Sequence, residues 1–292
     1  MWDLLQSGFV RNLVEVGVLL PAAVTIILAA AMYWGTRNYF PWRAVVWAPA
    51  LLTGFLSGYA AIYRNFSFPP RTVLSWLPWV AAAGGATVAL ADRLGRNYWG
   101  YGARGVAAGV SSFVLLWPIL RQEAISSGLH DWLTVTVLWS LLWFLLAPHR
   151  QDQKLAGTTL LVGTMGLALV APLSGSILLA QLGATLAVVL AIALLLSIFV
   201  AGSRWHSPSA DVGILILGAL LVDLRFYAGA SVAVIAWLLV SLAAGSGMAR
   251  IIRQRGTVAG CAVAAPGLVS LLPMAVAIWM ALRVYRASGG GY

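Results

Sequence analysis

Apolar runs of about twenty residues recur along the whole chain, separated by short connections that carry most of the charged residues. An α-helix needs roughly 20 apolar residues to cross about 30 Å of hydrocarbon. Charged residues make up only 9% of the 292 residues, whereas ordinary soluble domains contain about 25%. The sequence therefore predicts an all-α, polytopic transmembrane helical bundle that forms one integral membrane domain, residues 1–292.

The apolar runs, read against charged and aromatic punctuation, predict about ten membrane-spanning helices joined by short loops. No hydrophilic stretch is long enough to fold as a separate soluble domain. Any site must therefore be built from helices and short loops. The predicted helices cover residues 14–33, 44–62, 73–91, 105–120, 132–147, 156–173, 176–200, 210–224, 228–247 and 258–282.

The net charge of +10 is spread over the short connections and is not gathered into a basic domain. This distribution argues against nucleic acid as a partner, and we interpret the basic residues as topology signals. More of them lie in the connections that contain Arg104, Arg150 and Lys154 than in the alternate connections. The positive-inside rule then predicts that both termini lie outside the cytoplasm. The expected location is a bacterial inner (plasma) membrane.

A weak parallel repeat is predicted between residues 44–120 and 210–282. Residues 104–110 read RGVAAGV and residues 255–261 read RGTVAGC, and each follows a helix that begins with Trp-Leu and contains Ala-Ala-Gly. Internal repeats are common in transporters, with binding sites where the repeats meet. The alternative is that these glycines only form GxxxG faces for close helix packing, including packing with other membrane proteins. The GxxxG faces contain Gly54, Gly58, Gly105, Gly109, Gly256 and Gly260.

The stretch LLVDLRFYAG, residues 220–229, places Asp223 and Arg225 in a long apolar region. Residues 212–247 are fewer than the roughly 42 that two spans and a turn require, so the helix carrying these charges is predicted to be short or to stop part way. A charged residue at the membrane centre costs about 2.5–3.5 kcal/mol on insertion scales, which makes both residues candidates for binding a substrate or ion. The alternative is an exposed turn, with Arg225 extended to lipid phosphate.

Glu15 and Asp131 are the other acidic candidates for binding a substrate or ion. Glu15 begins the first span and, with an outside N-terminus, is expected on the same side as Arg225, so we predict that the two pair. Glu15 has an alternative partner in Arg11, four residues earlier on the same helix. Asp131 has an alternative role as the N-cap of the helix predicted to begin at residue 132.

Arginines close to aromatic residues at the ends of the runs are candidates for binding a lipid phosphate group. The alternative is simple anchoring of the helix ends in the headgroup region. These candidates are Arg64, Arg71, Arg93 and Arg96.

A tryptophan stripe is predicted along the helix at 132–147, because Trp132, Trp139 and Trp143 are spaced to share one helical face. We interpret it as a lipid-facing or packing stripe. The alternative is an aromatic wall along a substrate path.

Several chemistries lack their sequence signatures. His130, His149 and His206 all fall in connections, Cys261 is alone, and no spacing suits a metal cluster. The chain contains no Walker loop, dinucleotide fingerprint or nucleophile elbow. We therefore predict no metal and no cofactor, and the balance favours a protein that is not an enzyme.

A permease or transporter of a small solute or amphiphile is the function that the sequence favours, since rare acids and arginines at membrane depth are typical of solute pathways. One alternative is a non-catalytic membrane subunit of a larger complex, held by small-residue helix faces. Another is an enzyme or flippase for a lipid or a lipid-linked sugar, which would use the headgroup-binding arginines.

Overall fold

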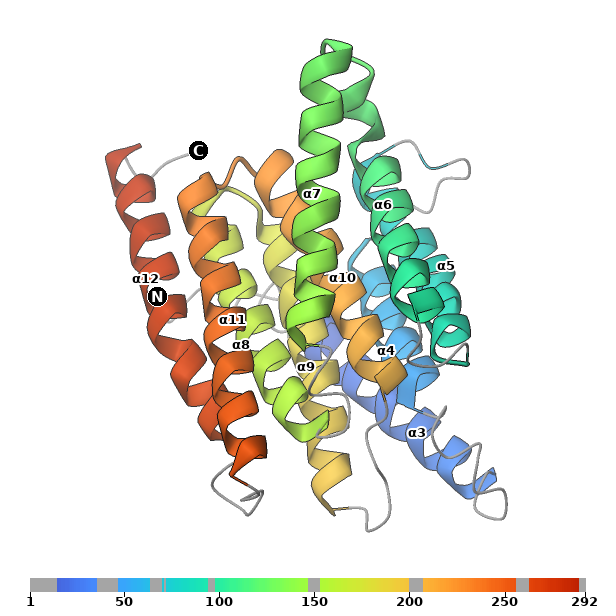
Figure 1. The fold of residues 1–292 in the computed structure, drawn as a ribbon. Coiled ribbons are helices and arrows are strands. Elements are labelled where there is room, and N and C mark those ends of the chain that lie inside the picture. The colour runs from blue at the N-terminus through green and yellow to red at the C-terminus, as the bar shows by residue number, and fades with distance from the viewer. Residues whose placement is uncertain are drawn as a thin grey trace.

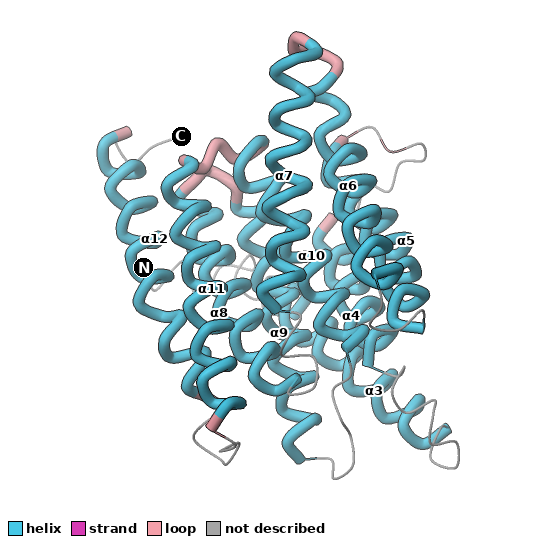
Figure 2. Tube along the Cα trace, in the orientation of Figure 1, coloured by secondary structure: helices cyan, strands magenta, loops and turns pink. Residues whose placement is uncertain are grey.

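The computed structural model describes residues 15–35, 47–63, 70, 72–93, 98–146, 153–199, 207–255 and 263–288. Within these residues the chain forms a π-helical turn and ten α-helices and has no strand (Figures 1 and 2). The elements are η1 (Glu15–Leu19), α3 (Leu20–Gly35), α4 (Trp47–Ile62), α5 (Val73–Arg93), α6 (Tyr98–Leu120), α7 (Ile125–Leu146), α8 (Gln153–Leu173), α9 (Ile177–Phe199), α10 (Ser207–Phe226), α11 (Val232–Gln254) and α12 (Ala265–Ala287). The predicted all-α bundle is confirmed.

Seven of the described helical segments are long and apolar enough to cross a membrane. They are Gly17–Gly35, Gly100–Leu120, Ile125–Leu146, Leu155–Leu173, Ile177–Ser197, Val232–Gln254 and Ala265–Ala287, and Ala48–Ile62 is a shorter apolar helix. The protein is therefore a multi-pass integral membrane protein. The bacterial inner membrane, the outside placement of the termini and the parallel repeat remain predictions.

Helix α10 is the centre of the bundle (Figure 1). It contacts α4, α5, α6, α7, α8, α9 and α11, and every residue from 209 to 224 is buried. Its interior positions are apolar around the whole circumference, which is typical of a helix covered on all sides. Asp211 and Asp223 of α10 therefore face protein and not lipid.

The other helices surround α10 in two groups. Helices α8, α9, α11 and α12 pack together on one side, and α3 and α4 pack against α9. On the other side α5, α6 and α7 form a row in which each helix packs against the next. The hairpin between α6 and α7 extends beyond the ends of the neighbouring helices (Figures 1 and 2).

The prediction of a short hairpin around Asp223 is wrong. Helix α10 has 20 residues, a length of about 30 Å at 1.5 Å per residue. Helix α11 continues to Gln254, past the predicted end at residue 247, and contains Arg250 and Arg253. Both arginines are exposed, and their long side chains can reach the interface while the helix backbone continues through it.

The prediction that Asp131 caps a helix is also wrong. Helix α7 begins at Ile125, so Asp131 lies within the helix, where its backbone does not have the non-helical conformation of an N-cap. The polar residues Ser126, Ser127 and His130 precede it inside the same helix. Periodicity of apolar residues does not detect such a polar first turn.

Small residues allow close packing inside the bundle, as the GxxxG face of α4 shows. A Cβ atom at Gly54 would overlap the side chain of Thr25 in α3, and one at Gly58 would overlap Pro21 and Thr185. This face therefore joins α4 to α3 and α9 within one chain.

The second GxxxG face, on α6, is more open. Gly109 accepts a hydrogen bond at its carbonyl oxygen from Trp132 Nε1 at 3.0 Å, whereas a Cβ at Gly105 would meet nothing within 4 Å. Contact of this face with another membrane protein remains a prediction. Gly256 and Gly260 lie outside the described residues.

The tryptophan stripe of α7 packs inward. Trp139 and Trp143 are each 2% exposed and their rings stack with centroids 6.4 Å apart. The indole of Trp139 lies against Gly218 of α10, where any side chain would overlap it. The stripe is thus a packing surface, with Trp139 against the central helix and Trp132 against α6.

Candidate functional site

Helix α10 carries three charged residues, Asp211 near its first turn and Asp223 and Arg225 in its last. The two acids are twelve residues apart, about 18 Å along the axis at 1.5 Å per residue. The structure gives each of the three a different environment. Their differences identify the candidate site.

Asp223 is buried without a hydrogen-bond partner. The residue is 1% exposed, and neither Oδ1 nor Oδ2 has a partner among the described residues. Its backbone carbonyl is fully used, because it accepts from Tyr227 N at 2.9 Å and from Ala228 N at 3.1 Å where the helix ends. The backbone of Asp223 is therefore held in place at the helix end, while its side chain is left unsatisfied.

Asp223 lies in the wall of a cavity of about 390 Å³. This cavity, which we call the Asp223 cavity, lies where the ends of α5, α6, α9 and α10 meet. Its walls are mostly apolar, with hydroxyl groups from three residues. The lining residues are Thr72, Val73, Leu74, Pro118, Ser176, Leu179, Asp223 and Tyr227.

Four helix ends meet at the Asp223 cavity. Helix α5 begins beside Thr72, which accepts from Ser75 N at 3.3 Å, and α9 begins after Ser176, which accepts from Leu179 N at 3.3 Å. Helices α6 and α10 end nearby, at Leu120 and Phe226, and Pro118 and Tyr227 beside these ends line the cavity. Helix N-termini carry partial positive charge and C-termini partial negative charge. Two ends of each kind largely offset one another, so Asp223 dominates the charge of the cavity.

Two tyrosines flank Asp223 without satisfying it. Tyr59 donates its hydroxyl hydrogen to Leu74 O at 2.7 Å, and Tyr227 donates to Leu115 O at 2.8 Å. These bonds hold both rings in place and leave neither hydroxyl hydrogen for the carboxyl group. Both rings are therefore held in place, while the carboxyl group of Asp223 has no hydrogen-bond partner among the described residues.

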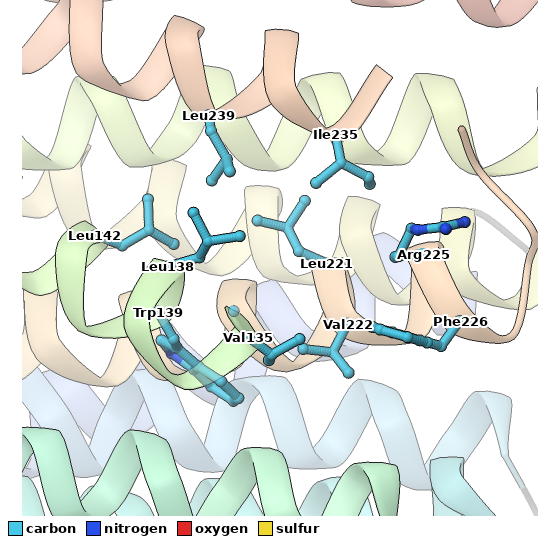
Figure 3. Close-up of a pocket in the computed structure, with 11 residues that line it drawn as sticks. Val135, Leu138, Trp139, Leu142, Leu221, Val222, Arg225, Phe226, Ile235 and Leu239 are labelled. Atoms are coloured by element: carbon cyan, nitrogen blue, oxygen red, sulfur yellow. The ribbon is translucent and has the colours of Figure 1, made fainter. Parts of the chain in front are cut away.

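Arg225 is turned away from the Asp223 cavity. It donates from Nη1 to Ala230 O at 3.1 Å, and its guanidinium carbon lies 5.7 Å from the centroid of the Phe226 ring. It lies at one end of an apolar pocket of about 80 Å³ between α7, α10 and α11 (Figure 3). The remaining walls come from Val135, Leu138, Trp139, Leu142, Gly218, Leu221, Val222, Phe226, Ile235 and Leu239. The structure thus separates the two charges that the sequence places side by side.

The predicted pairing of Glu15 with Arg225 is not formed among the described residues. Glu15 is exposed in η1, which packs against α3, α4 and α9. As a candidate for binding a substrate or ion it lies apart from the Asp223 cavity, and so does the partly exposed Asp131.

Four arginines are the candidates for binding a lipid phosphate group, and one of them lies among the described residues. Arg93 is the last residue of α5, and Arg64, Arg71 and Arg96 lie outside the described residues. Their role remains a prediction.

A buried ion pair, not predicted from the sequence, joins Arg104 of α6 to Asp211 of α10. Arg104 donates to Asp211 Oδ2 from Nε at 3.1 Å and from Nη2 at 2.8 Å, and from Nη1 to Gly100 O at 2.9 Å. The two side chains are 4% and 1% exposed. Arg104 is thus inside a helix and is not a topology signal in a connection. A signal existed, because Asp211 is an acid directly before the apolar run that begins at residue 212.

Comparisons of the chain with protein-family models, curated proteins and solved structures find no match. The function must therefore be argued from the two acids of α10. One of them is satisfied by an arginine, and the other is unsatisfied at a cavity.

Proposed function

We propose that the protein is a permease for a small solute, and that the Asp223 cavity binds the solute or the ion coupled to its movement. The observation that carries the proposal is the burial of Asp223 without a hydrogen-bond partner in the wall of this cavity. Ionisable residues inside membrane bundles commonly mark substrate or ion pathways.

A purely structural role for Asp223 has little physical support. Leaving a buried polar group unsatisfied costs about 1–3 kcal/mol, and Asp223 obtains no bond among the described residues that offsets this cost. Asp211 on the same helix shows the structural alternative, since its carboxylate receives two bonds from Arg104. An acid that stays unsatisfied beside a cavity is expected where a ligand binds the acid and later leaves.

The size and position of the cavity also support solute binding. Pockets for small molecules commonly enclose about 300–1,000 Å³, with apolar walls and a few polar groups. The Asp223 cavity, at about 390 Å³, lies within that range. The cavity also borders the central helix. A movement of α10 would therefore alter both the cavity and the contacts of α10 with most of the bundle.

Flux into vesicles tests the proposal. The full chain is reconstituted into proteoliposomes, and uptake of a panel of labelled small solutes is compared among the wild type, Asp223→Asn and Glu123→Gln. Glu123 is an exposed acid in the turn between α6 and α7, so it controls for loss of one negative charge. We expect Asp223→Asn to reduce uptake at least tenfold and Glu123→Gln to leave it unchanged. Equal uptake by Asp223→Asn and the wild type would refute the role of the cavity.

A further inference from the structure

We infer that the ligand of the Asp223 cavity is a small organic ammonium ion, which takes the place of a proton on Asp223. This inference rests on the proposed function and specifies the charge and size of what the site binds. It follows from three features of the cavity: its charge, the unused oxygens of its acid, and its volume.

The cavity carries a negative charge when Asp223 is ionised. Among the described residues that line it, Asp223 carries the only formal charge. Arg225, the nearest cation in the sequence, bonds to Ala230 O on another side of α10. Arg121, at the end of α6, lies over the Trp117 ring at 4.9 Å. These two arginines would therefore not repel a positively charged ligand, and the Asp223 carboxylate would attract it.

The hydrogen-bonding capacity of the cavity also fits an ammonium group. Both oxygens of Asp223 lack a donor, and a primary ammonium offers three N–H donors. Bonds between an ammonium and a carboxylate are charge-assisted and about twice as strong as neutral ones. The ring of Tyr227, which lines the cavity, adds a face that attracts cations. An anion or a neutral solute would leave the carboxyl group without this compensation.

The volume of the cavity favours an organic ion over a metal ion as the ligand. A space of about 390 Å³ is far larger than the roughly 30 Å³ that one water molecule occupies in the liquid. Calcium takes six to eight oxygen ligands and magnesium about six, and no three His, Cys, Asp or Glu side chains gather at one place among the described residues. The apolar walls instead suit the hydrocarbon part of an organic amine.

Proton exchange follows from the burial of the acid. Both carboxyl oxygens of Asp223 are buried, and an ionised carboxylate buried without a partner is so costly that such a group is held neutral. Binding then involves rotation of the carboxyl group into the cavity. Its O–H bond breaks, the proton leaves to water, and the carboxylate accepts N–H bonds from the ammonium. Tyr59 and Tyr227 are the titratable groups beside it, and both are bonded to backbone carbonyls.

Three probes of similar shape and different charge test the inference. Phenethylamine, phenylethanol and phenylacetate are added to the full chain in lipid nanodiscs near neutral pH, and binding and proton release into weak buffer are measured. We expect phenethylamine to bind at least tenfold more tightly than phenylethanol, as one charge-assisted bond predicts, and to release up to one proton per molecule bound. Phenylacetate should not bind.

Two substitutions of Asp223 and one control complete the test. Asp223→Asn should abolish the preference for phenethylamine and the proton release, Asp223→Glu should keep the preference, and Glu123→Gln should change neither. Equal binding of the amine and the alcohol, or preference retained in Asp223→Asn, would overturn the ammonium inference. Uptake of an uncharged solute that depends on Asp223 would overturn this inference alone, since the proposed permease function would stand.

Discussion

The ion pair between Arg104 and Asp211 should contribute to stability in a way that substitution can measure. Arg104 makes three hydrogen bonds of 2.8–3.1 Å, two of them to Asp211 Oδ2, and both side chains are almost fully buried. Removing one partner of a buried ion pair typically costs 3–5 kcal/mol, because the other charge is left uncompensated. We expect Arg104→Met and Asp211→Leu each to lower the free energy of unfolding by about 3–5 kcal/mol.

The double variant is the decisive measurement. When both charges are absent, no uncompensated partner remains from this pair, so Arg104→Met/Asp211→Leu should lose about 2–3 kcal/mol less than the sum of the single losses. The assay is reversible unfolding of the purified protein in mixed micelles, followed by tryptophan fluorescence. Arg121→Met is the control, because Arg121 is exposed and its stacking on Trp117 is worth only about 0.5–1 kcal/mol. Additive single losses, or single losses below about 1 kcal/mol, would refute the reasoning.

Three further predictions use the same unfolding assay. Asp223→Asn should leave the free energy of unfolding within about 1 kcal/mol of the wild type or raise it, since no partner is lost; a loss like that of Asp211→Leu would contradict this. Gly218→Ala should cost about 1–3 kcal/mol because its Cβ overlaps Trp139, whereas Gly247→Ala, with nothing within 4 Å, should be neutral or slightly stabilising. Tyr227→Phe removes one bond to a backbone carbonyl and should cost about 1 kcal/mol, and an unchanged midpoint would contradict that bond.

The fold was largely predictable because the bilayer imposes a length and a polarity on each helix. All ten predicted helices are present, and their ends differ most where charged or polar residues continue a helix. Helix α6 begins at Tyr98 and includes Arg104. This arginine can lie inside the bundle because its bond partner, Asp211, lies in α10. A prediction that treats each arginine as the end of a helix cannot detect a partner more than one hundred residues away.

The site was predictable only in part. The rarity of acids in an apolar chain made Asp223 a candidate, since any acid at such a position needs a reason to be there, and the structure places Asp223 in the wall of a cavity. Asp223 and Arg225 contact different pockets, because residues two apart do not share a helix face. The convergence of four helix ends on one cavity depends on tertiary packing, and no local sequence pattern encodes it.

The two acids of α10 together indicate where the protein is rigid and where it can change. At one end of the helix, Arg104 fixes Asp211 to α6 through two hydrogen bonds. At the other end Asp223 has no partner among the described residues, and Gly229, with φ of +69°, allows the chain to reverse before α11. A ligand that binds Asp223 therefore gains its contacts at the end of α10 that the ion pair does not hold. Because a ligand shifts a conformational equilibrium only by its differential affinity for the two states, an ammonium would favour the carboxylate rotated into the cavity, while a proton would favour the buried carboxyl group.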